Sequence, residues 1–200
     1  RPRRHRTALG QRDRSPNVRL MADDWIQQID ASWTLFLDRD GVINRKLEND
    51  YVKHIDEFEF LPEVLKSLEI CANTFGTIVV VTNQQGVGKG LMSENELLGI
   101  HQFMLAEVFN HGGRIDAVQY CTGLAKDNPP CRKPNTGMAF EAREKFPEID
   151  FSRSVMVGDS VSDMEFGHRL GMQCVRIGHS DPEHFSTPSL FHFVERISSK

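Results

Sequence analysis

Features that would define several other protein classes are scarce or absent in this sequence of 200 residues. No apolar run approaches the roughly 18 residues that a membrane-spanning helix needs. The four cysteines are Cys71, Cys121, Cys131 and Cys174, which is too sparse a pattern for a disulfide scaffold. No apolar signal-peptide region precedes them. We therefore expect a cytoplasmic protein in a reducing compartment, with no membrane partner.

The remaining composition is that of an ordinary globular protein. Hydrophobic residues make up 39% and charged residues 26% of the chain. A chain of this size can bury one sizeable core without added staples, because the buried share of the surface rises with length. We expect one folded domain over residues 21–200.

The charge is distributed unevenly. Seven arginines and one aspartate give residues 1–20 a charge of +6, which leaves −10 on the other 180 residues. Phosphate backbones select basic faces, so the acidic body argues against a nucleic-acid partner. The basic segment has no apolar periodicity, and we expect it to be a solvated, disordered arm or an appended remnant outside the fold. A nucleic-acid or membrane tail, and a transit peptide, are the alternatives.

From Trp33 onwards, short apolar runs alternate with helical patterns. Helices are predicted from about Pro62 to Gly76, after a capping box at Ser93–Glu96, from Met138, and from Val161 to Gly171. A loop rich in proline and glycine covers residues 122–137, and residues 190–197 suggest one more short element. Strands are predicted at 33–37, 77–81, 117–121, 155–157 and 173–177.

This alternation predicts an α/β fold, a Rossmann-like three-layer sandwich with a mainly parallel sheet. Chemistry in such folds lies at the carboxyl ends of the strands. Polar clusters directly follow three of the predicted strands, as the rule requires: Asp38/Asp40, Thr82/Asn83 and Asp159/Asp163. The segment between Asp40 and Thr82 must also hold a helix, which leaves no room there for a large cap domain, that is, a second domain inserted over the carboxyl ends of the strands.

Asp38 and Asp40 place two carboxylates at one strand end. Close carboxylates repel each other and raise one another's pKa unless a cation lies between them. Mg²⁺ suits this position because it prefers oxygen ligands and retains waters and substrate phosphate. Asp159 supplies a third oxygen from another strand end. A single such aspartate would be read as a cap or turn former, but the repeated placement favours a metal site.

The segment Thr82–Gly86 offers a hydroxyl, amides and backbone N–H groups after a buried strand, which suits phosphate oxygens. Its continuation is no P-loop, because Asn83 stands where the first glycine belongs and Gly90 follows Lys89. The dinucleotide pattern G-x-G-x-x-G also fails, at Leu91. Lys133, beside Arg132 in the later loop, is either a solvated lysine or a group that neutralises a transferring phosphoryl group.

Four segments, in order and spacing, resemble the motifs of the haloacid dehalogenase-like phosphatases: Asp38–Asn44, Thr82–Gly86, Arg132–Pro134 and Gly158–Asp163. The loop Tyr51–Phe60 is similar to that of their heptose bisphosphate and histidinol phosphatase subgroup. The resemblance covers about residues 33–178. It implies a phosphatase acting on a phosphorylated sugar, D-glycero-D-manno-heptose 1,7-bisphosphate at the 7-position, in cell-surface polysaccharide precursor synthesis.

The resemblance also implies a role for each motif residue. Asp38 would attack phosphorus and form an aspartyl-phosphate. Asp40 would act as general acid and then as general base, and so needs a higher pKa than its ionised neighbour. Asp38, the backbone carbonyl of Asp40 and Asp159 would hold Mg²⁺. Thr82 and Lys133 would stabilise the phosphoryl charge, and the supporting residue Asp163 would orient Lys133 or a metal-bound water. Asn83 and Arg132 would bind the substrate.

The sequence departs from that subgroup at its zinc loop, of the form C-x-H…C-x-C. Cys121 and Cys131 occupy the outer positions, but Gly123 and Pro129 replace two ligands. Two thiolates do not complete a tetrahedral site, so we predict no structural zinc and a loop held by packing. Cys71 and Cys174 are predicted core residues. The eight histidines show no ligand spacing, which predicts surface or packing roles.

Other functions share parts of this pattern. The same chemistry could act on histidinol phosphate, another small phosphomonoester or a nucleic-acid 3′-phosphate, and the acidic body disfavours the last. A catalytically inactive binding or regulatory domain is the alternative from another class, and the intact aspartates and Lys133 argue against it. We expect a monomer.

Overall fold

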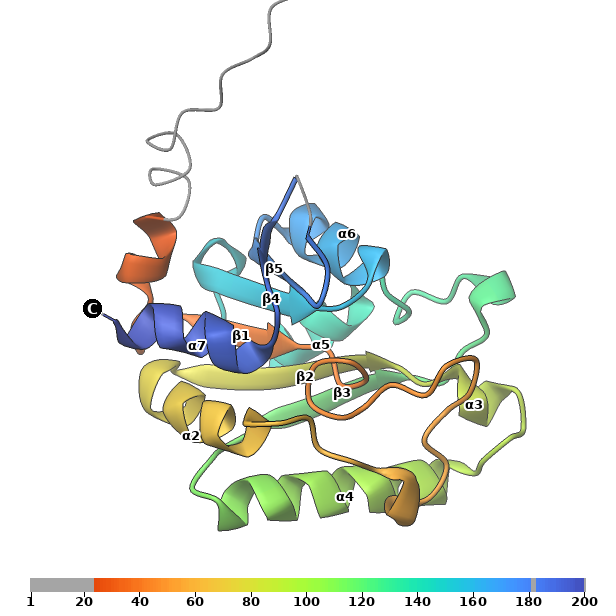
Figure 1. Cartoon of the computed structure of the whole chain (residues 1–200). Helices are drawn as coiled ribbons and strands as arrows, with labels where there is room; N and C mark the ends of the chain where they lie inside the picture. The colour runs from red at the N-terminus through yellow and green to blue at the C-terminus, as the bar shows by residue number, and fades with distance from the viewer. Residues whose placement is uncertain (1–23, 181–182, 200) are drawn as a thin grey trace, which may run out of the picture.

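The computed structural model describes residues 24–180 and 183–199 (Figure 1). The predicted basic arm, residues 1–20, lies outside the described residues. Within them, the chain forms a sheet covered on both faces by helices. The predicted α/β three-layer sandwich is therefore confirmed.

The sheet has six strands in the order β3-β2-β1-β4-β5-β6, and all neighbouring pairs are parallel. Parallel strands need crossover connections, and helices supply them between successive strands from β1 to β5. Five strands were predicted from their apolar runs. The short edge strand β6 was not, because its three residues carry no apolar run. The strands are β1 Thr34–Leu37, β2 Thr77–Asn83, β3 Ala117–Cys121, β4 Ser154–Gly158, β5 Gln173–Ile177 and β6 Phe185–Thr187.

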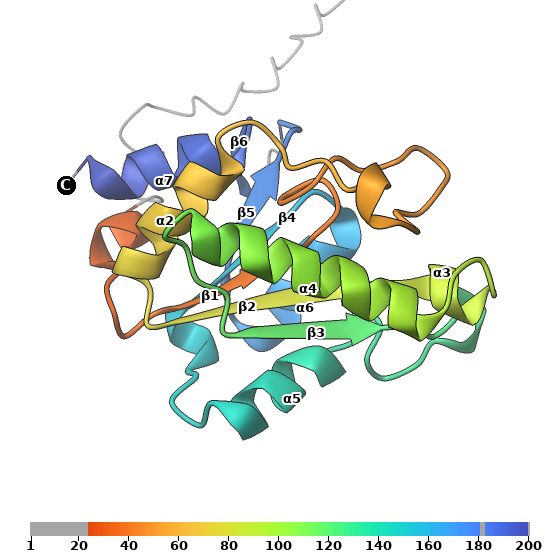
Figure 2. The same ribbon diagram turned by 90° about the horizontal axis from the view of Figure 1, so that it is seen from below.

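The α-helices are α2 Val64–Thr74, α3 Gln85–Gly88, α4 Glu94–Asn110, α5 Gly137–Lys145, α6 Val161–Leu170 and α7 Leu190–Ser198. The described residues also form short 3₁₀ helices: η1 Asp24–Gln28, η2 Ile55–Glu57, η3 Ala125–Asp127 and η4 Phe151–Arg153. The helices α2, α4 and α7 cover one face of the sheet, and α5 and α6 cover the other (Figures 1 and 2).

The central strands are buried on both faces. In β1, Leu35 and Leu37 join the core on the α2/α4/α7 side, whereas Phe36 points to the α5/α6 side. Alternation along a strand explains this division, because successive side chains leave opposite faces. The two cores hold β1 rigidly, so the residue that follows Leu37 has a fixed position.

Helix starts follow the predicted local chemistry. Ser93 caps α4 in a reciprocal capping box with Glu96, as predicted. Ser160 and Asp163 form a second capping box at the start of α6, and Gly171 ends that helix with a left-handed φ of 73°. The helix α2 begins later than predicted: Pro62 precedes the N-cap Glu63, which has a left-handed φ of 59°.

Two long loops border the carboxyl ends of the strands among the described residues. Residues 38–63, between β1 and α2, form a loop around η2, and residues 122–136 form another around η3. The first is the orange loop of Figures 1 and 2. The expectation that no large cap domain interrupts this region is confirmed. No helix in the part of the chain that the structure describes has the length and apolarity to cross a membrane.

Candidate active site

Asp38 lies directly after β1, at the carboxyl end of the central strand. Its backbone N–H donates to the carbonyl of Val157 at 2.9 Å, which fastens this end of β1 to β4. The chain then turns sharply, since three successive N–H groups point at the carbonyl of Arg39. Gly41 completes the turn with a φ of 91°, which a residue with a Cβ adopts only under strain.

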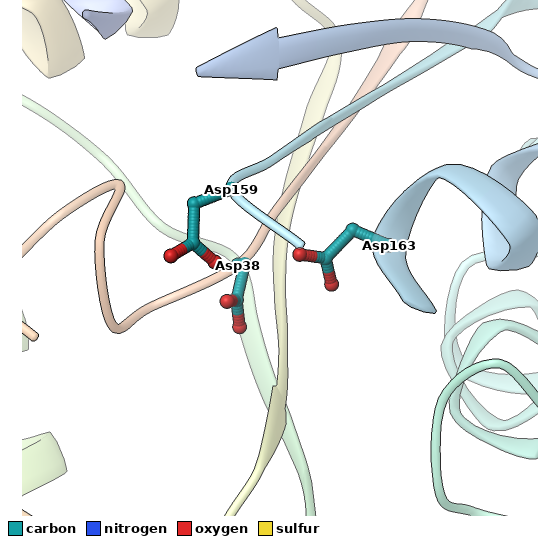
Figure 3. Close-up of side chains that lie close together, drawn as sticks. All are labelled: Asp38, Asp159 and Asp163. Atoms are coloured by element: carbon teal, nitrogen blue, oxygen red, sulfur yellow. The ribbon is translucent and has the colours of Figure 1, made fainter. Parts of the chain in front are cut away.

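Three carboxylates meet at this point. Ligand oxygens of Asp38, Asp159 and Asp163 all lie within 4.8 Å of one another, and we call these residues the acid cluster (Figure 3). Asp159 follows β4, and Asp163 lies in the first turn of α6. The sequence predicted that Asp38 and Asp159 lie close enough to bind the same metal ion, and their distance agrees with this.

Lys133 places its ammonium between two of these acids, Asp38 and Asp163. Its Nζ lies 2.8 Å from Asp38 Oδ1 and 2.6 Å from Asp163 Oδ1, and it donates to the carbonyl of Val81 at 2.7 Å. Burial alone would lower the pKa of Lys133, but the charges of Asp163 and Asp38 outweigh it and raise that pKa. Lys133 is thus a buried, charged group and not a solvated lysine. Of the two roles expected for Asp163, the structure shows the contact with Lys133.

Burial raises the pKa of Asp38 to about 7. Lys133 opposes this rise, while the negative charges of Asp163 and Asp40 add to it. One lysine therefore does not neutralise the cluster. A further cation bound here would favour the ionised form of Asp38, which is the form that can act as a nucleophile.

Asp40 is held by several donors. Arg39 Nη2 donates to its two oxygens at 3.0 and 3.1 Å, Asn44 Nδ2 at 2.9 Å and Gln84 Nε2 at 2.8 Å. Burial raises the pKa of Asp40, but the charge of Arg39 and these hydrogen bonds outweigh it, and the pKa is lowered. The expectation that Asp40 has a higher pKa than Asp38 is wrong in this structure. The reason is that burial outweighs the charge of Lys133 at Asp38, whereas Arg39 and the hydrogen-bond donors outweigh burial at Asp40.

Thr82 and Asn83 end β2 beside these groups. The Thr82 side chain is fully buried, and its Oγ1 accepts a hydrogen bond from Gln84 Nε2 at 2.8 Å. Asn83 bonds to the backbone of Lys133 in both directions: its Oδ1 accepts from the N–H at 3.0 Å, and its Nδ2 donates to the carbonyl at 3.1 Å. Asn83, predicted to bind substrate, thus fixes the position of Lys133.

Comparisons with known proteins place this arrangement in a family. A family model for HAD-hydrolase-like proteins matches residues 130–192. The D-glycero-alpha-D-manno-heptose-1,7-bisphosphate 7-phosphatase of Mycobacterium bovis is 41% identical over 138 residues, which cover 69% of this chain and 73% of that protein. This chain belongs to the haloacid dehalogenase-like family.

Two further proteins are similar to this haloacid dehalogenase-like chain. The D-glycero-beta-D-manno-heptose-1,7-bisphosphate 7-phosphatase of Vibrio cholerae is 35% identical, over 71% of this chain and 78% of its own. The crystal structure of D,D-heptose 1,7-bisphosphate phosphatase from B. bronchiseptica, complexed with magnesium and phosphate, superposes with a TM-score of 0.76. It is 26% identical, and the match covers 84% of this chain and 98% of that one.

The acid cluster fits a divalent cation. Asp159 Oδ1 is buried and has no hydrogen-bond donor among the described residues, although buried carboxylate oxygens are normally paired. The donor set is made of carboxylate oxygens, which Mg²⁺ prefers over nitrogen or sulfur. The residues of this haloacid dehalogenase-like site therefore suit magnesium.

The loop before Arg132 differs from expectation. Cys121 and Cys131 form a disulfide, so the loop is closed covalently and not by packing alone. Cys121 ends β3 and Cys131 follows the returning loop, which brings their Cα atoms to 5.4 Å, within the usual range for a disulfide. Cys71 and Cys174 are buried and free, as predicted.

Arg132 lies beside this disulfide, at the border of the site. Its Nη1 atom is buried and makes no hydrogen bond to any described residue. Because Nη1 makes no such hydrogen bond, the guanidinium can still donate one to an oxyanion. The structure therefore leaves Arg132 available for the substrate role that the sequence predicts.

Sequence reasoning missed three contributors to this haloacid dehalogenase-like site. Lys46 Nζ contacts Asp159 Oδ2 at 2.7 Å, Gln84 bridges Asp40 and Thr82, and Arg39 holds Asp40. Arg39 and Gln84 lie inside the recognised motifs, so their positions in the sequence could have identified them as site residues. Lys46 could not be identified from the sequence, because no local pattern shows that it contacts a residue 113 positions away.

Proposed function

We propose that this chain is a magnesium-dependent phosphatase that removes the 7-phosphate of D-glycero-D-manno-heptose 1,7-bisphosphate. One observation carries the reaction: three carboxylates from separate strand and helix ends lie within 4.8 Å of one another, and a buried lysine contacts two of them. The names of relatives at 32–41% identity support the substrate. The chain is accordingly a phosphomonoester hydrolase.

In this proposal Asp38, Asp159 and the backbone carbonyl of Asp40 would hold Mg²⁺, which would supply positive charge to the phosphoryl group and favour ionised Asp38. Asp38 attacks phosphorus, and the bond to the sugar oxygen breaks as the aspartyl-phosphate forms. Asp40 must be protonated in the substrate complex, although Arg39 lowers its pKa in this structure, and it delivers that proton to the departing sugar oxygen. It then takes a proton from the water that hydrolyses the aspartyl-phosphate, which releases phosphate and regenerates Asp38.

The surrounding residues position these groups. Lys133 supplies positive charge to the phosphoryl oxygens, and Asp163 and Asn83 fix its two ends. Thr82, at the end of β2, supplies a hydroxyl donor to the phosphoryl oxygens. Arg132, with a free buried Nη1, contacts the second phosphate or the hydroxyls of the sugar.

The proposal is tested by phosphate release in the presence of Mg²⁺. The substrates are both anomers of the heptose bisphosphate, histidinol phosphate and a DNA 3′-phosphate. We expect the heptose bisphosphate to have the highest kcat/KM. The α-anomer should exceed the β-anomer, because relatives named for it reach 41% identity and those named for the β-anomer 35%. A preference for histidinol phosphate would overturn the substrate, and no phosphate release from any substrate would overturn the reaction.

Asp38→Asn tests the nucleophile. The amide cannot form an aspartyl-phosphate, so turnover should fall below detection while the circular dichroism spectrum and melting temperature stay close to those of the native protein. Exposed Asp127 in η3 provides a matched control, and Asp127→Asn should retain full activity. Retained activity in Asp38→Asn would reject the assignment.

A further inference from the structure

Arg39, between the two aspartates of the first motif, is fully buried, with 0% exposure. An unpaired buried guanidinium would be very costly, so each of its contacts matters. Its Nη2 donates to both oxygens of Asp40. Its Nε has no partner among the described residues, and its Cζ lies 5.9 Å from the centre of the Phe58 ring.

The other end of the guanidinium meets a histidine from a distant helix. Arg39 Nη1 lies 3.2 Å from His101 Nε2, and His101, on α4, is only 4% exposed. Arginine can only donate, so Nε2 must be the unprotonated, accepting nitrogen of a neutral imidazole. Burial lowers the pKa of His101 to about 3, and the charge of Arg39 contributes to this shift. The histidine is therefore a permanent acceptor at neutral pH.

The guanidinium is planar, so its two ends move together. Fixing Nη1 on His101 fixes the direction in which Nη2 meets Asp40. Without that acceptor, Nη1 would join Nε as a buried donor with no partner, and Arg39 would have to shift to find one. Any such shift would turn the Asp40 carboxylate with it.

We propose that His101 is a positioning residue that acts through Arg39 and holds the Asp40 carboxyl group in the orientation needed for proton transfer to the departing sugar oxygen. This inference rests on the proposed phosphatase function and extends it to α4. It gives His101 a role beyond the packing one that the sequence suggested.

The chemistry of the leaving group provides a specific test. A sugar alkoxide is a poor leaving group and needs a proton as it departs, whereas p-nitrophenolate leaves without one. In both cases kcat/KM reports the steps up to the first irreversible one, which is formation of the aspartyl-phosphate. A misplaced Asp40 should therefore reduce kcat/KM for the heptose bisphosphate much more than for p-nitrophenyl phosphate.

The experiment compares the native protein with His101→Leu and His101→Gln on both substrates. We expect His101→Leu to lose about 10- to 100-fold in kcat/KM on the heptose bisphosphate, the size of effect that small misplacements produce. Its loss on p-nitrophenyl phosphate should be less than threefold. The glutamine variant, whose amide oxygen can accept from Arg39, should recover most of the activity. His101→Met, also without a nitrogen acceptor, is measured in parallel in case the leucine variant fails to fold.

Met104→Ala is the control for lost packing, because Met104 is buried on the same helix. It should reduce stability and affect both substrates equally. Equal losses on both substrates in the His101 variants, or no loss in a folded variant, would overturn the inference. A native protein that releases no phosphate from either substrate would instead overturn the proposed function.

Discussion

Lys46 brings a positive charge into the acid cluster from the loop after β1. Its ammonium lies 2.7 Å from Asp159 Oδ2, and its side chain is 53% exposed. Burial alone would lower the pKa of Lys46, but the hydrogen bond and charge of Asp159 raise it. The same carboxylate is a proposed magnesium ligand, so the lysine and the metal compete for it.

Removing that competitor should tighten magnesium binding. A partly exposed ion pair is worth up to about 1 kcal/mol, so Lys46→Met should lower the Kd for Mg²⁺ roughly two- to fivefold. Isothermal titration calorimetry measures this directly. Lys66→Met is the matched control, because Lys66 pairs with Glu69 on α2 and should leave the Kd unchanged. Weaker binding in Lys46→Met would show that the lysine assists the metal.

Gly41 is required for two separate reasons. Its φ of 91° disfavours any side chain, and an added Cβ would lie 2.5 Å from Asp159 Oδ2. Gly90 shares only the first reason, since its φ is 70° and nothing lies within 4 Å of its added Cβ.

The two glycines therefore separate backbone strain from a clash with the metal ligand. Gly41→Ala and Gly90→Ala should each lose about 1 kcal/mol of unfolding free energy from the left-handed conformation. Only Gly41→Ala should also weaken Mg²⁺ binding, by tenfold or more. Urea unfolding and magnesium titration of both variants check this, and equal magnesium affinities would refute the clash.

At the scale of elements, the disulfide joins the end of β3 to the segment that carries Arg132 and Lys133. The hydrogen bonds between Asn83 and the Lys133 backbone tie the same segment to β2. The residues proposed to contact the phosphate are thus held by one covalent and two hydrogen-bonded attachments. Loss of the covalent one should loosen the loop more than the strands.

Reducing this disulfide should lower stability. A closed loop of this length restricts the unfolded chain by about 2–3 kcal/mol, so dithiothreitol should reduce the unfolding free energy by that amount. The double variant Cys121→Ala/Cys131→Ala should show the lower stability without reductant and no response to it. The native-sequence protein can also be unfolded without reductant and its free thiols counted. Finding four free thiols would contradict the disulfide.

At the scale of the whole molecule, the site brings together residues from the ends of separate elements. Asp38 ends β1, Asp159 ends β4, Asp163 opens α6, and Lys133 follows the loop after β3. A cation held by these acids binds the folded chain but not the unfolded one. Ligand binding of this kind stabilises the whole domain.

Magnesium should therefore raise the melting temperature. At 100 times the Kd the stabilisation is about 2.7 kcal/mol, which corresponds to a shift of about 5–10 °C for a domain of this size. Differential scanning calorimetry with and without Mg²⁺ measures it. Asp159→Asn should lose most of the shift, whereas exposed Asp127→Asn should keep it. An unchanged shift in Asp159→Asn would place the metal elsewhere.

The sequence by itself determined where five of the strands lie along the chain and that the motif residues follow strand ends. The reason is local: the apolar runs of β1, β2 and β4 end directly before Asp38, Thr82 and Asp159, and parallel strands put those ends at one edge. The capping residues Ser93 and Gly171 also act through their immediate neighbours. Short segments without such patterns, η1, α3 and β6, were missed.

Only the tertiary structure decided which charges face one another. Arg39 contacts His101, which is 62 positions away in the sequence, and Arg39 lowers the pKa of Asp40. Lys46 contacts Asp159, which is 113 positions away. The pairing of Cys121 with Cys131 depended in the same way on how the loop returns. Burial and distance set these interactions, and both arise only when the whole chain has packed.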